Sequence, residues 1–225
     1  MQADDVAALV AAAGSGSRLG RGPKAFVELA GRSLLAWAVD ALRPFVGEVI
    51  VAVPAEAVEA ARRQVPGARV VSGAATRQAT VALLAAATAR RWVVIHDAAR
   101  PFLDAETVRA VLAALPQARA LSVAMTVADS LIDARDGSTV DRGPLRAVQT
   151  PQAFERRLLL DAHAAARVAG VEATDDAALV RRLGVPVALV PGGAHLMKVT
   201  TASDLQVAEA YARVLRAVAV AGETP

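Results

Sequence analysis

The sequence predicts an α/β fold with a doubly wound, mainly parallel sheet and a protruding β-arm. Short apolar segments alternate with segments of helical periodicity, at the close spacing typical of parallel strand–helix units. A single stretch, at about 127–153, interrupts this alternation. The 225 residues are enough to bury a core and show no internal repeat or linker. We therefore expect one domain over residues 1–225, with the arm at about 127–153.

The first half of the chain supplies most of the alternation. Each expected strand is a short apolar run, and each expected helix repeats apolar side chains three or four positions apart. Asp104 is a good N-cap for a helix through Leu115 because its carboxylate can accept a backbone N–H of the first turn. The expected strands are 6–12, 48–53, 68–71, 92–96 and 120–125, and the other expected helices are 34–42, 55–64 and 78–89.

The stretch at 127–153 has turn signals, Asp136-Gly137 and Gly143-Pro144, between short β-like pieces, and it has no helical pattern. We expect it to leave the sheet as the β-arm. After it, the pattern predicts helices at 155–168 and 176–183 and short strands at 187–190 and 196–199. Ser203 is expected to cap a last helix to about residue 220, and the tail 221–225 is expected to fray.

Composition excludes several classes of protein. The absence of cysteine excludes disulfides, thiolate metal sites and a cysteine nucleophile. A net charge of +3, spread along the chain, and only four Phe, two Trp and one Tyr argue against nucleic-acid binding. No uncharged apolar run is long enough to span a membrane, and the acidic N-terminus is unlike a signal peptide. These features predict a cytoplasmic protein without membrane partners.

A loop of small residues follows the first expected strand. It reads Ala12-Ala13-Gly14-Ser15-Gly16-Ser17-Arg18, and Pro23-Lys24 comes shortly after. Small residues let backbone N–H groups approach phosphates, and Arg18 and Lys24 add positive charge. An ordinary tight turn is the alternative. Leu19 stands where a dinucleotide-binding fingerprint has its third glycine, which disfavours a dehydrogenase, and the loop lacks the Gly-Lys-Ser/Thr of a P-loop. The loop therefore favours a nucleoside triphosphate.

Lysine is rare in this chain. Lys24 and Lys198 are its only lysines among 25 basic residues. Either two lysines remain by chance, or these two positions need a compact ammonium instead of a planar guanidinium.

A second motif, His96-Asp97-Ala98-Ala99-Arg100-Pro101, lies at the carboxyl end of an expected strand, where open α/β sheets bind ligands. A carboxylate there suits Mg²⁺, which usually takes one or two protein carboxylates and completes its shell with phosphates and water. Arg100 suits a phosphate. The alternatives are a capping aspartate and a surface ion pair, and His96 is interpreted as a packed or hydrogen-bonded histidine.

The loop at 12–18 with Pro23-Lys24 resembles the signature of nucleotidyltransferases that activate sugars and polyols. More narrowly, it resembles the 2-C-methyl-D-erythritol 4-phosphate cytidylyltransferases of the non-mevalonate isoprenoid pathway. The segment at 96–101 matches the HDAARP sequence of that family, and further matches follow in order over about residues 6–212. They are Asp129-Ser130, Asp141-Arg142, Thr150-Pro151-Gln152, Thr174-Asp175 and Lys198-Val199-Thr200.

The resemblance implies a nucleotide-diphospho-sugar transferase-like fold, the substrates CTP and a polyol phosphate, Mg²⁺ as cofactor, and a homodimer. By resemblance, Arg142 and Thr150 belong to the arm of one subunit and complete the polyol-phosphate site of the other. The implied catalytic residues are Arg18, Lys24, Arg142 and Lys198, and the implied metal ligand is Asp97. The implied nucleotide-binding residues are Ala12, Ala13, Gly14, Gly16, Arg18, Lys24, Gly73, Ala74, Thr80 and Asp97. The implied substrate-binding residues are Asp97, Ala98, Arg100, Ser130, Arg142, Thr150, Thr174 and Lys198.

Three positions depart from the family pattern. Ala74 replaces the second of two glycines, Thr80 replaces a serine, and Ser130 stands where threonine is frequent. These changes bear on contacts to the base and the polyol, not on the reaction. The alternatives are a cytidylyltransferase for ribitol 5-phosphate or another polyol phosphate, and a non-catalytic nucleotide-binding module.

Overall fold

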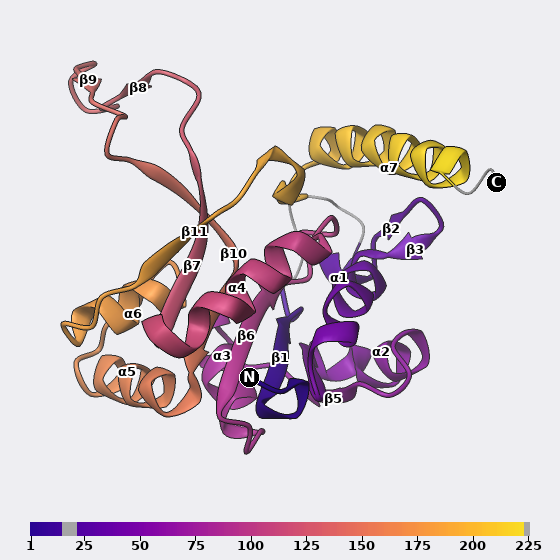
Figure 1. The fold of residues 1–225 in the computed structure, drawn as a ribbon, viewed down its shortest axis with the longest axis horizontal. Coiled ribbons are helices and arrows are strands. Elements are labelled where there is room, and N and C mark those ends of the chain that lie inside the picture. Colours follow the sequence, from indigo (N-terminus) through magenta and orange to yellow (C-terminus); the bar gives the residue numbers. More distant parts are fainter. Residues whose placement is uncertain (15–21, 223–225) are drawn as a thin grey trace.

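The structure is a computed structural model that describes residues 1–14 and 22–222. Seven strands form its central sheet in the order β11-β7-β10-β6-β1-β4-β5 (Figure 1). All neighbouring strands run parallel except β10, which is antiparallel to both β6 and β7. This arrangement confirms the predicted fold class. The strands are β1 (Val6–Ala11), β4 (Glu48–Val53), β5 (Arg69–Ser72), β6 (Trp92–Asp97), β7 (Ala120–Thr126), β10 (Arg146–Glu155) and β11 (Ala188–Pro191).

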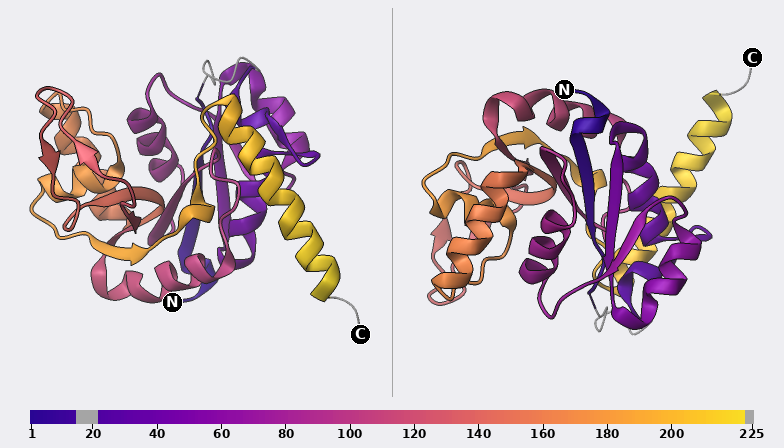
Figure 2. Two further views of the ribbon diagram at one scale, coloured as in Figure 1. Left: turned by 90° about the horizontal axis from the view of Figure 1, so that it is seen from above. Right: turned by 90° about the horizontal axis from the view of Figure 1, so that it is seen from below.

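Helices cover both faces of the sheet (Figure 2). Alternate side chains of β1 point to opposite faces, as the pleat of a strand requires. Ala8 and Val10 pack with α1, α2 and α4, whereas Ala7 and Leu9 pack with α3, α5 and α6. The central strands are apolar along their whole length because both of their faces are buried. The helices of these layers are α1 (Leu34–Leu42), α2 (Val58–Gln64), α3 (Arg77–Ala86), α4 (Ala105–Ala118), α5 (Arg156–Val168) and α6 (Asp176–Arg182).

The last helix, α7 (Ala202–Gly222), packs outside these two layers. Leu205 and Ala208 bury against Leu29 of a small hairpin and against Phe102. Figure 1 shows α7 extending past the body of the molecule beside that hairpin. The hairpin strands are β2 (Glu28–Leu29) and β3 (Arg32–Ser33), and the 3₁₀ turns are η1 (Ala3–Asp5), η3 (Lys24–Phe26), η4 (Arg43–Phe45), η5 (Ala55–Ala57) and η6 (Ala194–Leu196).

The arm is shorter than the sequence predicts. Among the residues that the structure describes, its two strands, β8 (Leu131–Ile132) and β9 (Thr139–Val140), pair only with each other, and they project away from the body (Figure 1). The expected arm extended to residue 153, but Arg146–Glu155 is a strand of the central sheet. The sequence pattern does not predict this strand because it contains polar residues. Gln149 and Gln152 of the strand are buried, and their side chains donate to Gly193 O and Ser122 Oγ.

Two smaller expectations are also wrong. Residues 196–199 form no strand, because η6 ends at Leu196 and the chain then runs on to a backbone hydrogen bond from Val199 N to Ala99 O. Ser203 does not cap α7. Thr201 Oγ1 accepts the N–H of Asp204, and the Asp204 carboxylate accepts the N–H of Thr201 in return. The Asp104 cap is confirmed, since its side chain accepts the N–H of Thr107.

Candidate active site

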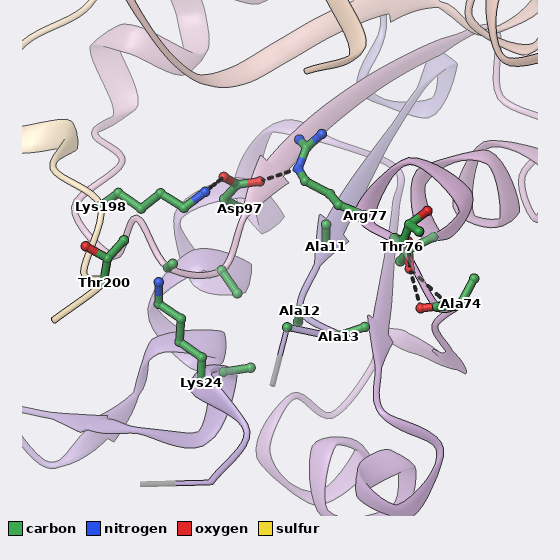
Figure 3. Close-up of a pocket in the computed structure, with 16 residues that line it drawn as sticks. Ala11, Ala12, Ala13, Lys24, Ala74, Thr76, Arg77, Asp97, Lys198 and Thr200 are labelled. Atoms are coloured by element: carbon green, nitrogen blue, oxygen red, sulfur yellow. Dashed lines mark hydrogen bonds and ion pairs between the residues drawn. The ribbon is translucent and has the colours of Figure 1, made fainter. Parts of the chain in front are cut away.

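A cleft of about 480 Å³ opens at the carboxyl ends of β1 and β6 (Figure 3). The chain runs from β1 outward to β4 and β5 and then returns to the other side of β1 to form β6. The cleft therefore lies at the switch point of a doubly wound sheet, where such folds bind ligands. Its walls are residues 11–14 after β1, 74–77 and Thr80 after β5, 97–99 after β6, and Lys24, Ala25, Lys198 and Thr200.

Both lysines of the chain line this cleft. Lys24 belongs to η3, and its backbone N–H donates to Gly14 O, which ties η3 to the loop after β1. Lys198 reaches the cleft from the opposite wall, and its Nζ lies 2.6 Å from Asp97 Oδ2. Figure 3 shows both ammonium groups directed toward the same space. This placement fits the interpretation that both positions need a compact ammonium.

Asp97 lies between two cations. Lys198 contacts its Oδ2, and Arg77 Nε donates to its Oδ1 at 3.1 Å. Burial alone would raise the pKa of Asp97, but the charges of Arg77 and Lys198 outweigh it and hold the pKa well below its usual range. Asp97 is therefore an ionised carboxylate at the base of the cleft.

Arg77 is a site residue that sequence analysis did not select. It is the first residue of α3, and it bridges two carboxylates, because its Nη1 also donates to Asp176 Oδ2 at 2.8 Å. Burial lowers the pKa of Arg77, but Asp97 and Asp176 raise it above its ordinary value. One signal could have found it: Arg77 follows β5 as Asp97 ends β6, so both occupy the carboxyl edge of the sheet.

His96 is fully buried and takes part in a fixed hydrogen-bond chain. Its Nε2 lies 2.9 Å from Arg100 O, and its Nδ1 lies 3.0 Å from Thr150 Oγ1. Because a carbonyl can only accept, Nε2 carries the proton and Nδ1 accepts from the Thr150 hydroxyl. Burial lowers the pKa of His96 from 6.5 to about 4. His96 is thus a neutral, packed histidine, as expected.

The placement of Thr150 is a correction. It was expected on the arm of a partner subunit, but it lies in β10 of the central sheet and is buried. Its hydroxyl also accepts the N–H of Asp97 at 3.2 Å. The reason is that β10 is long enough to include Thr150 in the central sheet of its own chain. There the Thr150 hydroxyl accepts the backbone N–H of Asp97.

Arg100 is not among the residues that line the cleft. Its Nη1 donates to Leu196 O at 2.6 Å, and its Nη2 lies 3.5 Å from Val148 O. Arg100 therefore fastens η6 and β10 to the end of β6. The neighbouring Ala98, by contrast, lines the cleft.

The wall after β5 is shaped by close packing. A Cβ added to Gly73 would lie 2.5 Å from Ala13 Cβ, so only glycine fits between the two loops. Thr80 Oγ1 accepts the N–H of Ala74 at 3.0 Å and donates to Thr76 O at 2.8 Å. The hydroxyl that Thr80 retains thus sets the shape of the loop at Ala74.

The structure does not bring every expected residue to the cleft. Ser130 and Arg142 are exposed on the arm and are not among the residues that line it. Thr174 is exposed, and the cap of α6 is Asp175. Gly16 and Arg18 lie outside the described residues. Within the described ranges there is no group of three or more His, Asp or Glu side chains placed to hold a metal, and no helix that could cross a membrane.

A model of the 2-C-methyl-D-erythritol 4-phosphate cytidylyltransferase family matches residues 6–214. The chain belongs to this family. The cytidylyltransferase of Deinococcus radiodurans is 56% identical over 207 residues, which cover 91% of this chain and 88% of the relative. That of Thermus thermophilus is 46% identical over 216 residues, covering 93% and 98%.

A crystal structure of the cytidylyltransferase from Thermus thermophilus superimposes with a TM-score of 0.83 at 42% identity. It covers 95% of this chain and 100% of that one. The resemblance found in the sequence is therefore confirmed, and the protein is a nucleotidyltransferase of the methylerythritol phosphate cytidylyltransferase family.

Proposed function

We propose that the chain catalyses cytidylyl transfer from CTP to 2-C-methyl-D-erythritol 4-phosphate in isoprenoid precursor biosynthesis. A phosphate oxygen of the acceptor bonds to the α-phosphorus of CTP, and the bond between the α- and β-phosphates breaks. The products are 4-diphosphocytidyl-2-C-methyl-D-erythritol and pyrophosphate. The observation that carries this proposal is the cleft at the sheet switch point, which places Lys24, Lys198 and Asp97 around one space in a member of this family.

The reaction needs control of charge more than it needs proton transfer. A phosphate monoester is mostly dianionic at neutral pH because its second pKa is about 6. The acceptor therefore attacks without a general base, but it must approach a polyanion. We assign Lys24 and Arg18 to the phosphates of CTP, where they offset negative charge on the α-phosphoryl oxygens and on the leaving pyrophosphate. We assign Lys198 and Arg142 to the attacking phosphate.

Backbone groups and small side chains are assigned to the nucleotide. The loop after β1 contributes Ala12, Ala13 and Gly14 to one wall of the cleft. The facing wall contains Ala74 and Thr80, and Gly73 beside them packs against Ala13. The small side chains on both walls leave room for a nucleotide in the cleft. Gly16 is assigned to the same loop by family resemblance.

Mg²⁺ fits the residues at the base of the cleft. Asp97 is ionised, and Mg²⁺ commonly takes a single protein carboxylate while phosphates and water fill its shell. Each Asp97 oxygen keeps a lone pair beside its present partner, Arg77 or Lys198. When bound, the metal would offset charge on the CTP phosphates.

The polyol side of the site is proposed to include Ala98, Arg100, Ser130, Thr150 and Thr174, of which Arg100 and Thr150 act through the backbone they hold. Arg142 is proposed to come from the arm of a second copy, because it is exposed on the arm and does not line the cleft of its own chain. A single domain with this arm and a cytoplasmic location remain predictions.

The test is pyrophosphate release from CTP and Mg²⁺ with 2-C-methyl-D-erythritol 4-phosphate, with ribitol 5-phosphate, or with no acceptor. Release that depends on methylerythritol phosphate, and is much weaker with ribitol phosphate, supports the proposal. Release only with ribitol phosphate would leave the roles of the cleft residues unchanged, and it would show that the acceptor is a different polyol phosphate. No release with either acceptor would favour a nucleotide-binding module.

The first predicted variant is Lys24→Met. Removing one charge-stabilising donor lowers turnover by roughly 100- to 1,000-fold. Thermal unfolding should be nearly unchanged, since Lys24 is partly exposed at the cleft. The matched control is Arg167→Met, which removes an exposed cation from α5. Wild-type turnover in Lys24→Met would remove Lys24 from the catalytic assignment.

A further inference from the structure

A chain of charges continues from the cleft into the core beneath it. It begins at Lys198 and passes through Asp97 and Arg77 to Asp176. The side chains of Asp97 and Asp176 are 10% and 1% exposed, whereas those of Arg77 and Lys198 are 31% and 39% exposed. The cations are therefore more exposed than the carboxylates, and positive and negative charges alternate along the chain.

Asp176 is buried and contacts residues of three other elements, β10, α3 and α5. It is the first residue of α6, and its N–H donates to Gln152 Oε1 in β10. His163 of α5 closes the other side, with its Nε2 3.2 Å from Asp176 Oδ1 but without the alignment of a hydrogen bond. Asp176 is thus a rigid anchor that lines no part of the cleft itself.

A buried carboxylate without a partner is costly, so Asp176 needs the guanidinium of Arg77. Arg77 in turn reaches the two carboxylates with two separate nitrogens of its planar guanidinium, a fixed geometry that the single ammonium nitrogen of a lysine does not provide. Its Nε faces Asp97 Oδ1, which leaves Asp97 Oδ2 to Lys198. The contact to Asp176 therefore decides where the guanidinium lies, and the guanidinium decides how the Asp97 carboxylate is turned.

We infer that Asp176 is a positioning residue of the reaction, which holds Arg77 so that Arg77 orients the Asp97 carboxylate toward Lys198 and the cleft. The inference rests on the proposed function, because Asp97 and Lys198 act there on the metal and the attacking phosphate. When a ligand draws Asp97 away from its present partners, Asp176 keeps Arg77 in place at the rim.

The experiment is a double-mutant cycle on the full chain, with turnover and thermal unfolding as readouts. Asp176→Asn keeps the shape of the side chain and removes its charge. We expect kcat to fall by roughly 10- to 100-fold, the loss that a displacement of about an ångström near the chemistry can cause. The KM for CTP should change less, because Asp176 does not line the cleft.

The second arm of the cycle is Arg77→Met. Its kcat should fall at least as far, and Asp176→Asn added to it should cause no further loss, since both act through one contact. The midpoint of thermal unfolding should respond differently from kcat. Arg77→Met leaves Asp176 buried and unpaired and lowers the midpoint, and adding Asp176→Asn should recover part of that decrease. Arg77→Lys, which keeps the charge without the fork, should resemble Arg77→Met in kcat.

The control is Asp161→Asn on the surface of α5, where the carboxylate also pairs with an arginine but both side chains are exposed. It should leave kcat and unfolding unchanged. Additive losses of kcat in the double variant, or wild-type kcat in Asp176→Asn, would overturn the positioning role while wild-type turnover still upholds the proposed function. A wild-type chain that is inactive with both acceptors would overturn both.

Discussion

Asp97 is held at both its backbone and its side chain. Thr150 accepts its backbone N–H, and Arg77 and Lys198 face its two carboxylate oxygens. Neutral His96 orients the Thr150 hydroxyl from behind. A residue held at both backbone and side chain loses little entropy when a ligand binds, because its rotamer is already fixed. Asp97 is therefore in place before any substrate arrives.

His96 gives a prediction about pH. Its pKa is about 4 in the folded chain and 6.5 when unperturbed, so between these values the unfolded chain binds a proton that the folded chain does not. The free energy of unfolding should be unaffected by His96 above pH 6.5 and should decrease as pH falls toward 4. The full effect is about 3 kcal/mol, at about 1.4 kcal/mol for each pKa unit.

Urea unfolding of the wild type and of His96→Gln, at pH 7 and at pH 4.5, checks this. The glutamine cannot be protonated, so the difference in unfolding free energy between the two proteins should shrink at the lower pH. Comparing the two proteins cancels every pH effect that they share. A difference independent of pH would contradict the neutral, buried state of His96.

At the level of elements, the segment that carries Lys198 is fastened by its neighbours. Arg100 at the end of β6 donates to Leu196 O, and Asp104 at the start of α4 contacts His195 Nε2. Asp104 also caps α4 through the N–H of Thr107. This segment is thus held by a helix-cap residue and an arginine, together with the backbone hydrogen bond from Val199 N to Ala99 O.

Asp104→Ala should destabilise the chain by about 1 kcal/mol, and up to about 2 kcal/mol, because the cap of α4 is lost. Asp104→Asn is the matched control, since asparagine caps a helix about as well as aspartate. Chemical denaturation should show a lower midpoint for the alanine variant and a midpoint near wild type for the asparagine variant. Equal destabilisation by both changes would show that the charge facing His195 matters more than the cap.

For the whole molecule, the arm raises the question of assembly. β8 and β9 extend beyond the sheet, and Ile132 on β8 is 66% exposed. Arg142 lies on the same projection. Under the proposed function, this arm would bring Arg142 to the cleft of a second copy in a symmetric dimer.

Mixing two inactive variants tests this assembly. If Arg142 acts in the cleft of the partner, a dimer of one Lys24→Met chain and one Arg142→Ala chain has one intact site. Random mixing should then restore about a quarter of wild-type turnover per chain, because half of the dimers are mixed and each has one working site of two. If Arg142 acts in its own chain, no turnover returns.

The sequence predicts those elements whose stabilising contacts depend on residues close together in the chain. The apolar runs of β1 and β6 and the cap at Asp104 could be found because burial on both faces and helix capping leave direct marks on the sequence. It failed for β10, where the buried Gln149 and Gln152 find partners only in the folded sheet. It also missed Arg77, because its partner Asp176 lies 99 positions away.

The presence of both lysines in one cleft also makes the site selectively visible to chemistry. Reductive methylation with ¹³C-formaldehyde modifies amines, so in this chain it would label only Lys24, Lys198 and the α-amino group. Two of the three NMR signals would then report on the cleft walls. Because Lys198 contacts Asp97 and Lys24 comes from η3, each wall would have its own reporter of nucleotide or acceptor binding, without the introduction of a foreign side chain.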